Sequence, residues 1–257
     1  ILDHLGGGRL NGSLSRQRGR LFHCLASPCV GTGPMKPREL VGTAKVPGGV
    51  ELRLLRHGDD HIIMVDNNEL MNSRVGGSEE ALAVMTCERL RKGADPHLLI
   101  GGYGMGFTLR AALAILGKGA RVTVAELVPE IIDWARTHMS ALTAGGLDDP
   151  RVHLVAGDVA AQIGAAPRRY DAILLDVDNG PDPFVQNRNE RLYAKPGIVR
   201  IKNALHPGGR VIFWSAHPDK SFARSLEGLF KNVECISAKA YPKAKRFSHT
   251  LFVADRE

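Results

Sequence analysis

LLIGGYGMGFTLRAALAILGKGARVTVAE, residues 98–126, is the stretch whose pattern predicts the fold. Its apolar start at 98–100 has the length and punctuation of a buried strand. A glycine-rich loop follows, then residues 107–116 carry apolar side chains at helical spacing. Residues 121–125 are rich in β-branched side chains and predict a second strand, with Glu126 at its carboxyl end. Strand, glycine loop, helix, strand and acid form the first half of a nucleotide-binding βαβ unit.

Each part of this unit has a physical role in holding a nucleoside. Gly102, Gly104 and Gly106 lack Cβ atoms, so the loop can turn tightly and a ligand can lie against its backbone. The amides that open the helix at Phe107 point toward that ligand. Glu126 can accept hydrogen bonds from both hydroxyls of a ribose. The alternative is a loop that merely joins a strand to a helix, but the acid at the right distance favours a nucleoside site.

The glycine spacing separates this loop from other nucleotide-binding loops. A dinucleotide fingerprint that starts at Gly102 would need glycine where Phe107 stands, and no Lys-Ser/Thr pair of a P-loop follows. The G-x-G-x-G spacing resembles motif I of the class I S-adenosylmethionine-dependent transferases. It resembles the spermidine synthase branch more closely, where an isoleucine-glycine-glycine run opens the loop, as Ile100, Gly101 and Gly102 do here. The resemblance extends from Asn72 towards the C-terminus.

This resemblance implies a donor, a fold and a set of binding residues. The donor would be S-adenosylmethionine or its decarboxylated form. The fold would be α/β and Rossmann-like: a mostly parallel seven-stranded sheet with an antiparallel last strand, and a small N-terminal β-hairpin region. The implied donor-binding residues are Gly101, Gly102, Tyr103, Gly104, Gly106, Glu126, Leu127, Asp158, Val159 and Asp176. For Asp158, a helix N-cap is an alternative role, and both roles can coexist.

The remaining sequence continues the alternation of strands and helices. Predicted strands cover 152–155, 170–176, 210–215, 233–238 and 249–254, and predicted helices cover 78–90, 129–139, 191–205 and 218–230. Upstream, two apolar-rich runs at 50–55 and 61–65 flank a turn and predict a β-hairpin. We therefore expect a disordered arm or upstream extension at 1–34, a small β region at 35–77 and an S-adenosylmethionine-binding domain at 78–257.

Composition narrows the class of protein. The chain has 257 residues, 44% of them hydrophobic and 24% charged, which is ordinary for a soluble globular protein. No apolar stretch is long enough to span a bilayer, so no membrane partner is expected. The four cysteines are scattered and the histidines lack ligand-like spacing, which predicts free thiols, a cytoplasmic protein and no metal. The net charge of +7 comes from basic residues that do not alternate with aromatic residues, so we do not expect nucleic acid as a partner.

Candidate catalytic carboxylates follow the strand at 170–176. Asp176, Asp178 and Asp182 lie in a turn-prone loop at the sheet edge where open α/β folds bind ligands. The spermidine synthase loop reads aspartate, variable, serine or threonine, aspartate, proline. Asp176 matches its first aspartate, whereas Asn179 stands at the second, and Asp178 or Asp182 is a candidate substitute. We predict Asp176 and Asp178 as catalytic, positioning or deprotonating an acceptor.

The glycine loop also departs from the resembled family. Gly104 stands where the family has an aspartate that pairs with the amine of decarboxylated S-adenosylmethionine, and its tyrosine-histidine-glutamate signature is absent from 73–80. A buried ammonium needs a partner, so the sequence favours methyl transfer to a small acceptor, an amine among the candidates. The alternatives are aminopropyl transfer and a non-catalytic nucleoside-binding relative. The resemblance also implies a homodimer formed through the N-terminal hairpin.

Overall fold

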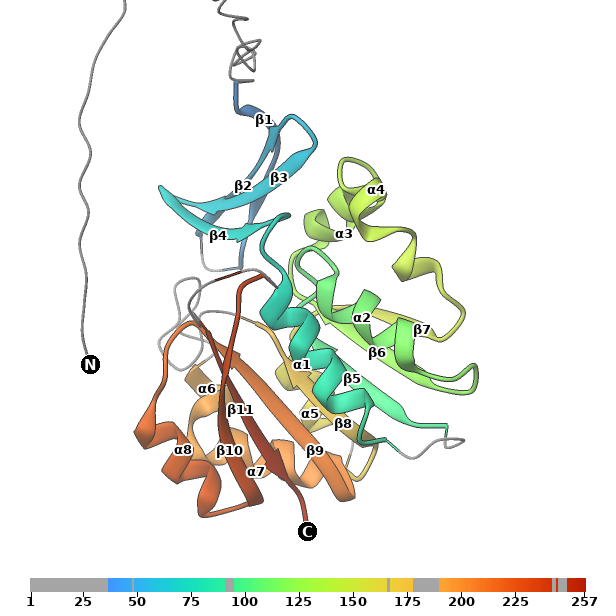
Figure 1. Ribbon diagram of the computed structural model, residues 1–257, viewed down its shortest axis with the longest axis vertical. Coiled ribbons are helices and arrows are strands. Elements are labelled where there is room, and N and C mark those ends of the chain that lie inside the picture. The colour runs from blue at the N-terminus through green and yellow to red at the C-terminus, as the bar shows by residue number, and fades with distance from the viewer. Residues whose placement is uncertain are drawn as a thin grey trace, which may run out of the picture. The chain divides into compact units, whose positions relative to one another are not determined.

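The structure, a computed structural model, describes residues 37–47, 49–90, 95–165, 167–177, 190–241, 244 and 249–257. The described residues form a seven-stranded sheet, a four-stranded sheet and the helices that cover the larger sheet (Figure 1). The predicted arm at 1–34 and the predicted catalytic Asp178 lie outside the described residues. None of the described helices is both long and apolar enough to cross a membrane.

The large sheet confirms the α/β prediction. Its strands are β5 (His97–Gly101), β6 (Arg121–Glu126), β7 (Val152–Ala156), β8 (Tyr170–Leu175), β9 (Leu205–Ser215), β10 (Lys231–Ala238) and β11 (His249–Asp255). They lie in the order β10-β11-β9-β8-β5-β6-β7, and β11 runs antiparallel to both of its neighbours, β10 and β9. β5 and β8 read as near-continuous apolar runs because helices cover both faces of the sheet.

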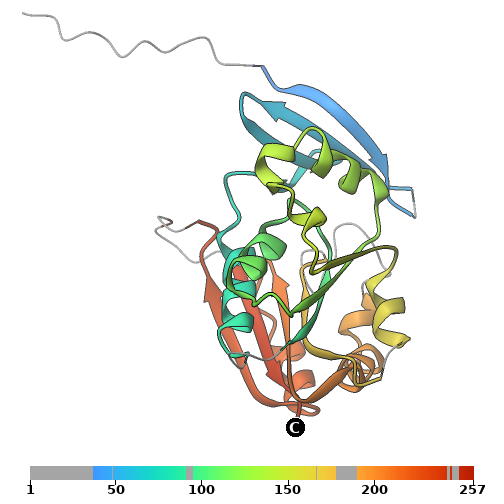
Figure 2. The same ribbon diagram turned by 90° about the vertical axis from the view of Figure 1, so that its right-hand side faces the viewer.

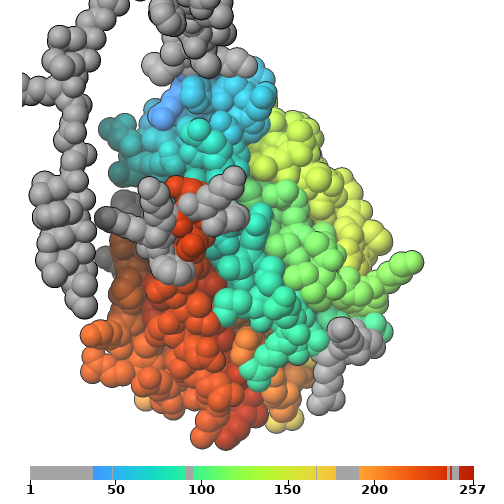
Figure 3. Space-filling view, in the orientation of Figure 1, coloured from blue at the N-terminus to red at the C-terminus, as the bar shows by residue number. Residues whose placement is uncertain are grey.

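The helices divide between the two faces of this sheet (Figure 1). On one face lie α1 (Gly77–Cys87), α2 (Phe107–Ile115) and α3 (Pro129–Arg136), and on the other α5 (Val159–Gly164), α7 (Lys195–Ala204) and α8 (Lys220–Glu227). Three shorter elements are α4 (Ser140–Thr143), η1 (Gly146–Asp148) and α6 (Glu190–Tyr193). The space-filling view shows α1 on the surface between the C-terminal strands, in orange and red, and α2, in green (Figure 3). This position brings the start of α1 to the edge of the sheet where the cavity lies.

The small sheet contains the predicted hairpin and two further strands. β2 (Glu51–His57) and β3 (Asp60–Val65) form the hairpin, and β1 (Glu39–Lys45) and β4 (Asn68–Asn72) flank it in the antiparallel order β1-β2-β3-β4. The sequence pattern predicted neither flanking strand. Figure 2 shows β1, in blue, beside α3. A Cβ atom built at Gly42 would lie 2.5 Å from Nε1 of Trp134, so β1 packs closely against this helix.

Two predicted boundaries in the second half are wrong. The single helix predicted at 191–205 is the pair α6 and α7, because Pro196 lies in the first turn of α7 and Ala194 before it is extended. The strand predicted at 210–215 begins at Leu205, so the turn-like residues 206–209 between the predicted helix and strand belong to β9. The pairing of β8 with β9 shifts register across this stretch, so an irregular strand was mistaken for a turn.

Candidate active site

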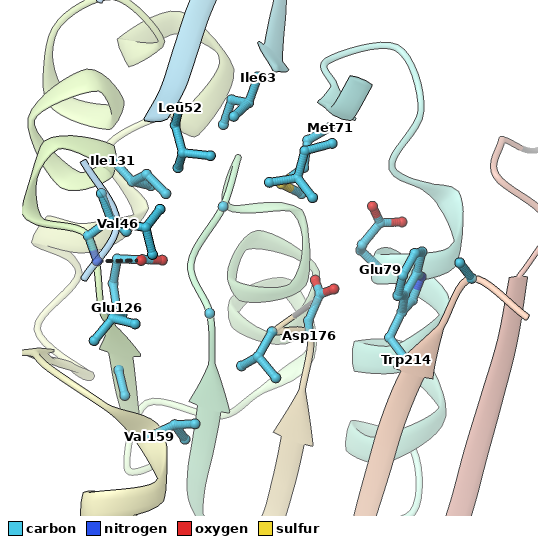
Figure 4. A pocket seen from close by; sticks show the side chains of 18 of the residues that line it. Val46, Leu52, Ile63, Met71, Glu79, Glu126, Ile131, Val159, Asp176 and Trp214 are labelled. Carbon is cyan, nitrogen blue, oxygen red and sulfur yellow. Dashed lines mark hydrogen bonds between the residues drawn. The ribbon is translucent and has the colours of Figure 1, made fainter. Parts of the chain in front are cut away.

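A cavity of about 330 Å³ lies at the carboxyl ends of β5, β6 and β8, below the small sheet (Figure 4). Its walls come from the glycine loop, from the small sheet and from the start of α1. Figure 4 shows Glu126 at one side of it and Glu79 and Asp176 at the other. The cavity therefore has two acidic ends, one predicted to bind a ribose and one able to bind a cation.

Glu126 ends β6 with its side chain only 5% exposed. Its Oε2 accepts a hydrogen bond from the Tyr103 backbone amide at 2.8 Å, and its Oε1 accepts one from the Val128 amide at 2.9 Å. Burial raises the pKa of this carboxyl, and the backbone N–H groups oppose that rise. Backbone amides thus hold the carboxylate in one orientation at the cavity wall.

Backbone conformation explains two of the loop glycines. Gly102 has φ +81°, and a Cβ atom there would lie 2.2 Å from the Asp176 carbonyl oxygen. Gly104 has φ +53°, and its Cβ would lie 2.6 Å from the sulfur of Met71. Side chains rarely adopt such positive φ values, and both sites are also crowded. The loop consequently lies directly against the end of β8 and against β4.

Most of the predicted donor-binding residues line the cavity. They are Gly102, Gly104, Glu126, Leu127, Asp158, Val159 and Asp176. Gly101, Tyr103 and Gly106 are not among the lining residues: Gly101 packs against Val159 and Leu175, and the buried Tyr103 ring lies beside Gly106. Tyr103 contributes to the site through its backbone amide. Donor binding by all ten residues stays a prediction.

Asp158 has the helix-capping role that the sequence offered as an alternative. It is the N-cap of α5, and its side chain accepts a hydrogen bond from the Ala160 amide at 2.8 Å. The side chain also lies at the cavity wall, close to the apolar Val159. A contact with the donor's base therefore remains compatible with the cap.

Asp176 directly follows β8 and lies at the cavity wall. Its Oδ2 accepts a hydrogen bond from the Thr108 hydroxyl at 3.1 Å. Burial, and next the nearby Glu79 carboxylate, raise the pKa of Asp176 to about 8. Burial likewise raises the pKa of Glu79, which is 6% exposed. Two carboxyl groups that share a water-poor wall hold a proton readily when the cavity is empty, and a cation bound between them would favour their ionised form.

Sequence analysis missed a hydrogen-bonded cluster behind Glu79. The hydroxyl of Ser78, which is fully buried, lies 2.5 Å from Oε2 of Glu79, 2.7 Å from Nδ1 of His249 and 3.0 Å from Nε1 of Trp214. Glu79, Trp214 and His249 all line the cavity. Glu79 lies in the first turn of α1, where an acid is ordinary, and no sequence pattern distinguishes Trp214 or His249. Packing of α1 against β9 and β11 is what brings them together.

The small sheet supplies an apolar wall that sequence analysis also missed. Leu52, Ile63 and Met71 line the cavity above the glycine loop (Figure 4). Their side chains are apolar, so this part of the wall excludes water from a bound ligand. The predicted hairpin is therefore part of the site.

Comparison with known proteins identifies the family. The model of the spermine/spermidine synthase domain matches residues 82–241. A polyamine aminopropyltransferase of Sulfolobus acidocaldarius is 32% identical over 147 residues, covering 54% of this chain and 47% of that protein. One of Mycobacterium tuberculosis is 31% identical over 171 residues, covering 65% of this chain and 31% of that protein. The chain thus spans half or less of the length of these curated relatives.

Solved structures agree on the fold. Spermidine synthase from Thermotoga maritima matches with a TM-score of 0.66 at 17% identity, covering 85% of this chain and 73% of the other. A spermidine synthase in complex with the transition state analogue AdoDATO matches with a TM-score of 0.65 at 17% identity, covering 85% and 72%. At this identity the likeness establishes the fold alone. Together with the match over residues 82–241, the β5–loop–α2–β6 unit and its terminal acid, it leads to one conclusion: the chain belongs to the spermine/spermidine synthase family.

Proposed function

We propose that this protein transfers an aminopropyl group from decarboxylated S-adenosylmethionine to a small amine. The observation that carries the proposal is the pair of carboxyl groups, Glu79 and Asp176, on one wall of the cavity, both with raised pKa. An amine acceptor reaches the protein as an ammonium, and such a wall attracts it. The polyamine aminopropyltransferases among the relatives favour this reaction over the methyl transfer preferred from sequence.

The opposite end of the cavity suits the donor's nucleoside. Backbone amides hold the Glu126 carboxylate at the cavity wall, where it can face the two ribose hydroxyls. Leu127 and Val159 offer apolar contacts to an adenine ring, and Asp158 offers an acceptor for its amino group. When bound, the donor supplies a carbon activated by the neighbouring sulfonium.

Asp176 then prepares the acceptor. The attacking amine has to be neutral, so a group beside it must take its proton. A carboxylate with a pKa of about 8 is a stronger base than an ordinary aspartate, because burial disfavours its charge. Thr108 donates to Oδ2 of Asp176 at 3.1 Å and holds the side chain in place. Asp176 thus combines orientation of the amine with removal of its proton.

The test is a product assay with purified protein. Decarboxylated S-adenosylmethionine is incubated with putrescine, cadaverine or spermidine, and mass spectrometry measures methylthioadenosine and the extended amine. We expect both products, and a loss of about 100-fold in kcat for Asp176→Asn. The matched control is Asp133→Asn, an exposed acid in α3, with unchanged kcat. Binding of the donor without product from any amine would overturn the proposal.

Methyl transfer is a second candidate because of one observation. Gly104 offers no anion for the donor's aminopropyl ammonium, and the Met71 sulfur fills the space beside it. Intact S-adenosylmethionine carries a carboxylate that backbone amides of the loop can bind. Formation of S-adenosylhomocysteine with a methylated amine, and no methylthioadenosine, would establish this alternative.

A further inference from the structure

We propose that Ser78 and His249 form a proton relay: the proton that Asp176 takes from the acceptor passes to Glu79 on the same cavity wall, and Ser78 and His249 carry it from Glu79 to the cavity water. This inference rests on the proposed amine chemistry of the site. It assigns a role to three side chains that the donor and Asp176 do not use. The residues come from α1 and β11, and Trp214 of β9 completes the cluster.

The hydrogen-bonding capacity of Ser78 is the first argument. A serine hydroxyl can donate one hydrogen bond and accept two. Trp214 Nε1, which can only donate, occupies one acceptor position at 3.0 Å. Glu79 at 2.5 Å and His249 at 2.7 Å must then share the remaining acceptor position and the single proton. The hydroxyl accepts from one of these two groups and donates to the other.

Both arrangements satisfy every group, and they differ by one proton transfer. In the first, protonated Glu79 donates to the hydroxyl, and the hydroxyl donates to Nδ1 of His249. In the second, the hydroxyl donates to the Glu79 carboxylate, and Nδ1–H of His249 donates to the hydroxyl. Passing from the first to the second breaks the O–H bond of Glu79, renews that of Ser78 and forms an N–H bond at Nδ1. The imidazolium so formed releases its Nε2 proton to water. Exchange with water then moves the remaining proton from Nδ1 to Nε2, which restores the first arrangement and closes the proton balance.

Position and electrostatics suit this direction of transfer. Glu79 lines the cavity next to Asp176, where the acceptor's ammonium is proposed to bind, and His249 lines it too and is partly exposed. Burial raises the pKa of Glu79 and lowers that of His249, which brings the two groups toward each other in proton affinity. The charged neighbours are Glu80 beside Glu79, and His217, which lowers the pKa of His249 further. The Trp214 and His249 rings, with centroids 4.7 Å apart, keep the imidazole in place.

The first experiment needs no activity. The ¹⁵N resonances of the His249 imidazole are followed against pH in the unliganded protein and in Ser78→Ala and Glu79→Gln. We expect its Nδ1 to titrate together with Glu79 in the natural protein, and this shared step to disappear in both variants. An unchanged titration in Ser78→Ala would overturn the relay whether or not the protein transfers aminopropyl groups. His153→Gln, an exposed histidine in β7, is the control with an unchanged profile.

The second experiment measures kinetics on the active amine. His249→Gln keeps a hydrogen-bonding amide but cannot carry a proton, so kcat should fall about 100-fold while the acceptor KM stays within about threefold. In the natural protein kcat should fall at low pH because the relay needs neutral His249, and this fall should be absent in His249→Gln. Added imidazole should restore activity to the His249→Gly variant. A raised KM with unchanged kcat and unchanged limb would show a structural role and refute the relay. If the natural protein makes no aminopropyl product, the proposed function fails while the resonance titration still decides the relay.

Discussion

Glu126→Gln tests the donor site most directly, because it changes charge and hydrogen bonding at constant size. Each carboxylate oxygen accepts a hydrogen bond from a backbone amide: Oε2 from Tyr103 at 2.8 Å and Oε1 from Val128 at 2.9 Å. In the variant the side-chain NH₂ group of glutamine replaces one carboxylate oxygen, so one of the two backbone N–H groups loses its acceptor. A buried donor without a partner costs about 1–3 kcal/mol of stability. This corresponds to a fall in Tm of about 2–4 °C per kcal/mol for a chain of this size. The two amide hydrogen bonds therefore predict a measurable loss of stability.

The same change should weaken the donor. One ribose hydroxyl loses a charge-assisted hydrogen bond worth about 1.5–3 kcal/mol, which is about a tenfold to hundredfold rise in Kd. Calorimetric titration with S-adenosylmethionine and with methylthioadenosine measures it, and both ligands should weaken alike because they share the ribose. Glu234→Gln, an exposed acid in β10, is the control. A folded Glu126→Gln protein that binds both ligands with unchanged Kd would refute the ribose assignment.

Three further predictions follow from single distances and pKa directions. The pKa of Asp176 is raised to about 8, so the folded state binds this proton more tightly than the unfolded state, and the free energy of unfolding should fall as the pH rises from about 4 to 8, by about 1.4 kcal/mol per pKa unit. In thermal melts, Asp176→Asn should reduce this dependence of stability on pH. An equal dependence in the variant and the natural protein would contradict the prediction. Gly102→Ala, at φ +81° and 2.2 Å from a carbonyl oxygen, should cost about 2–5 kcal/mol in denaturant unfolding, whereas Gly117→Ala, with no atom within 4 Å, should cost little. Gly104→Asp should displace the flexible end of the Met71 side chain. It should also shift the ratio of the Kd values for intact and decarboxylated S-adenosylmethionine by about one to two decades in favour of the decarboxylated donor. An unchanged ratio would show that the aminopropyl group of the donor does not lie beside residue 104.

Much of the cavity wall proposed to bind the donor was predictable because its signals are local in the chain. The apolar run before Gly101, the glycine loop, the β-branched strand and Glu126 lie within 98–126, and each follows from backbone conformation or strand burial. Parallel strands bring their carboxyl ends to one edge, so Asp176 could be placed near this loop from its position after β8.

The boundaries that failed were those where local signals conflict. Pro196 starts a helix as readily as it ends one, so the interruption between α6 and α7 was not visible in apolar spacing. His206, Pro207 and two glycines are typical of a turn, yet pairing with β8 draws them into β9. The edge strands β1 and β4 owe their conformation to neighbours in the small sheet, which local propensity does not encode.

The sequence by itself determined the alternation of strands and helices, the glycine loop and the acid that follows β6, because these depend on side-chain periodicity and on residues close in the chain. Only the tertiary structure decided the second acidic end of the cavity. Ser78 and His249 are separated by 171 positions and meet because α1 packs against the β9 and β11 edge of the sheet. Burial at that contact removes water from Glu79 and Asp176 and raises the pKa of both. Desolvation depends on which elements pack together, so no local sequence pattern identifies the residues that are proposed to transfer the amine's proton.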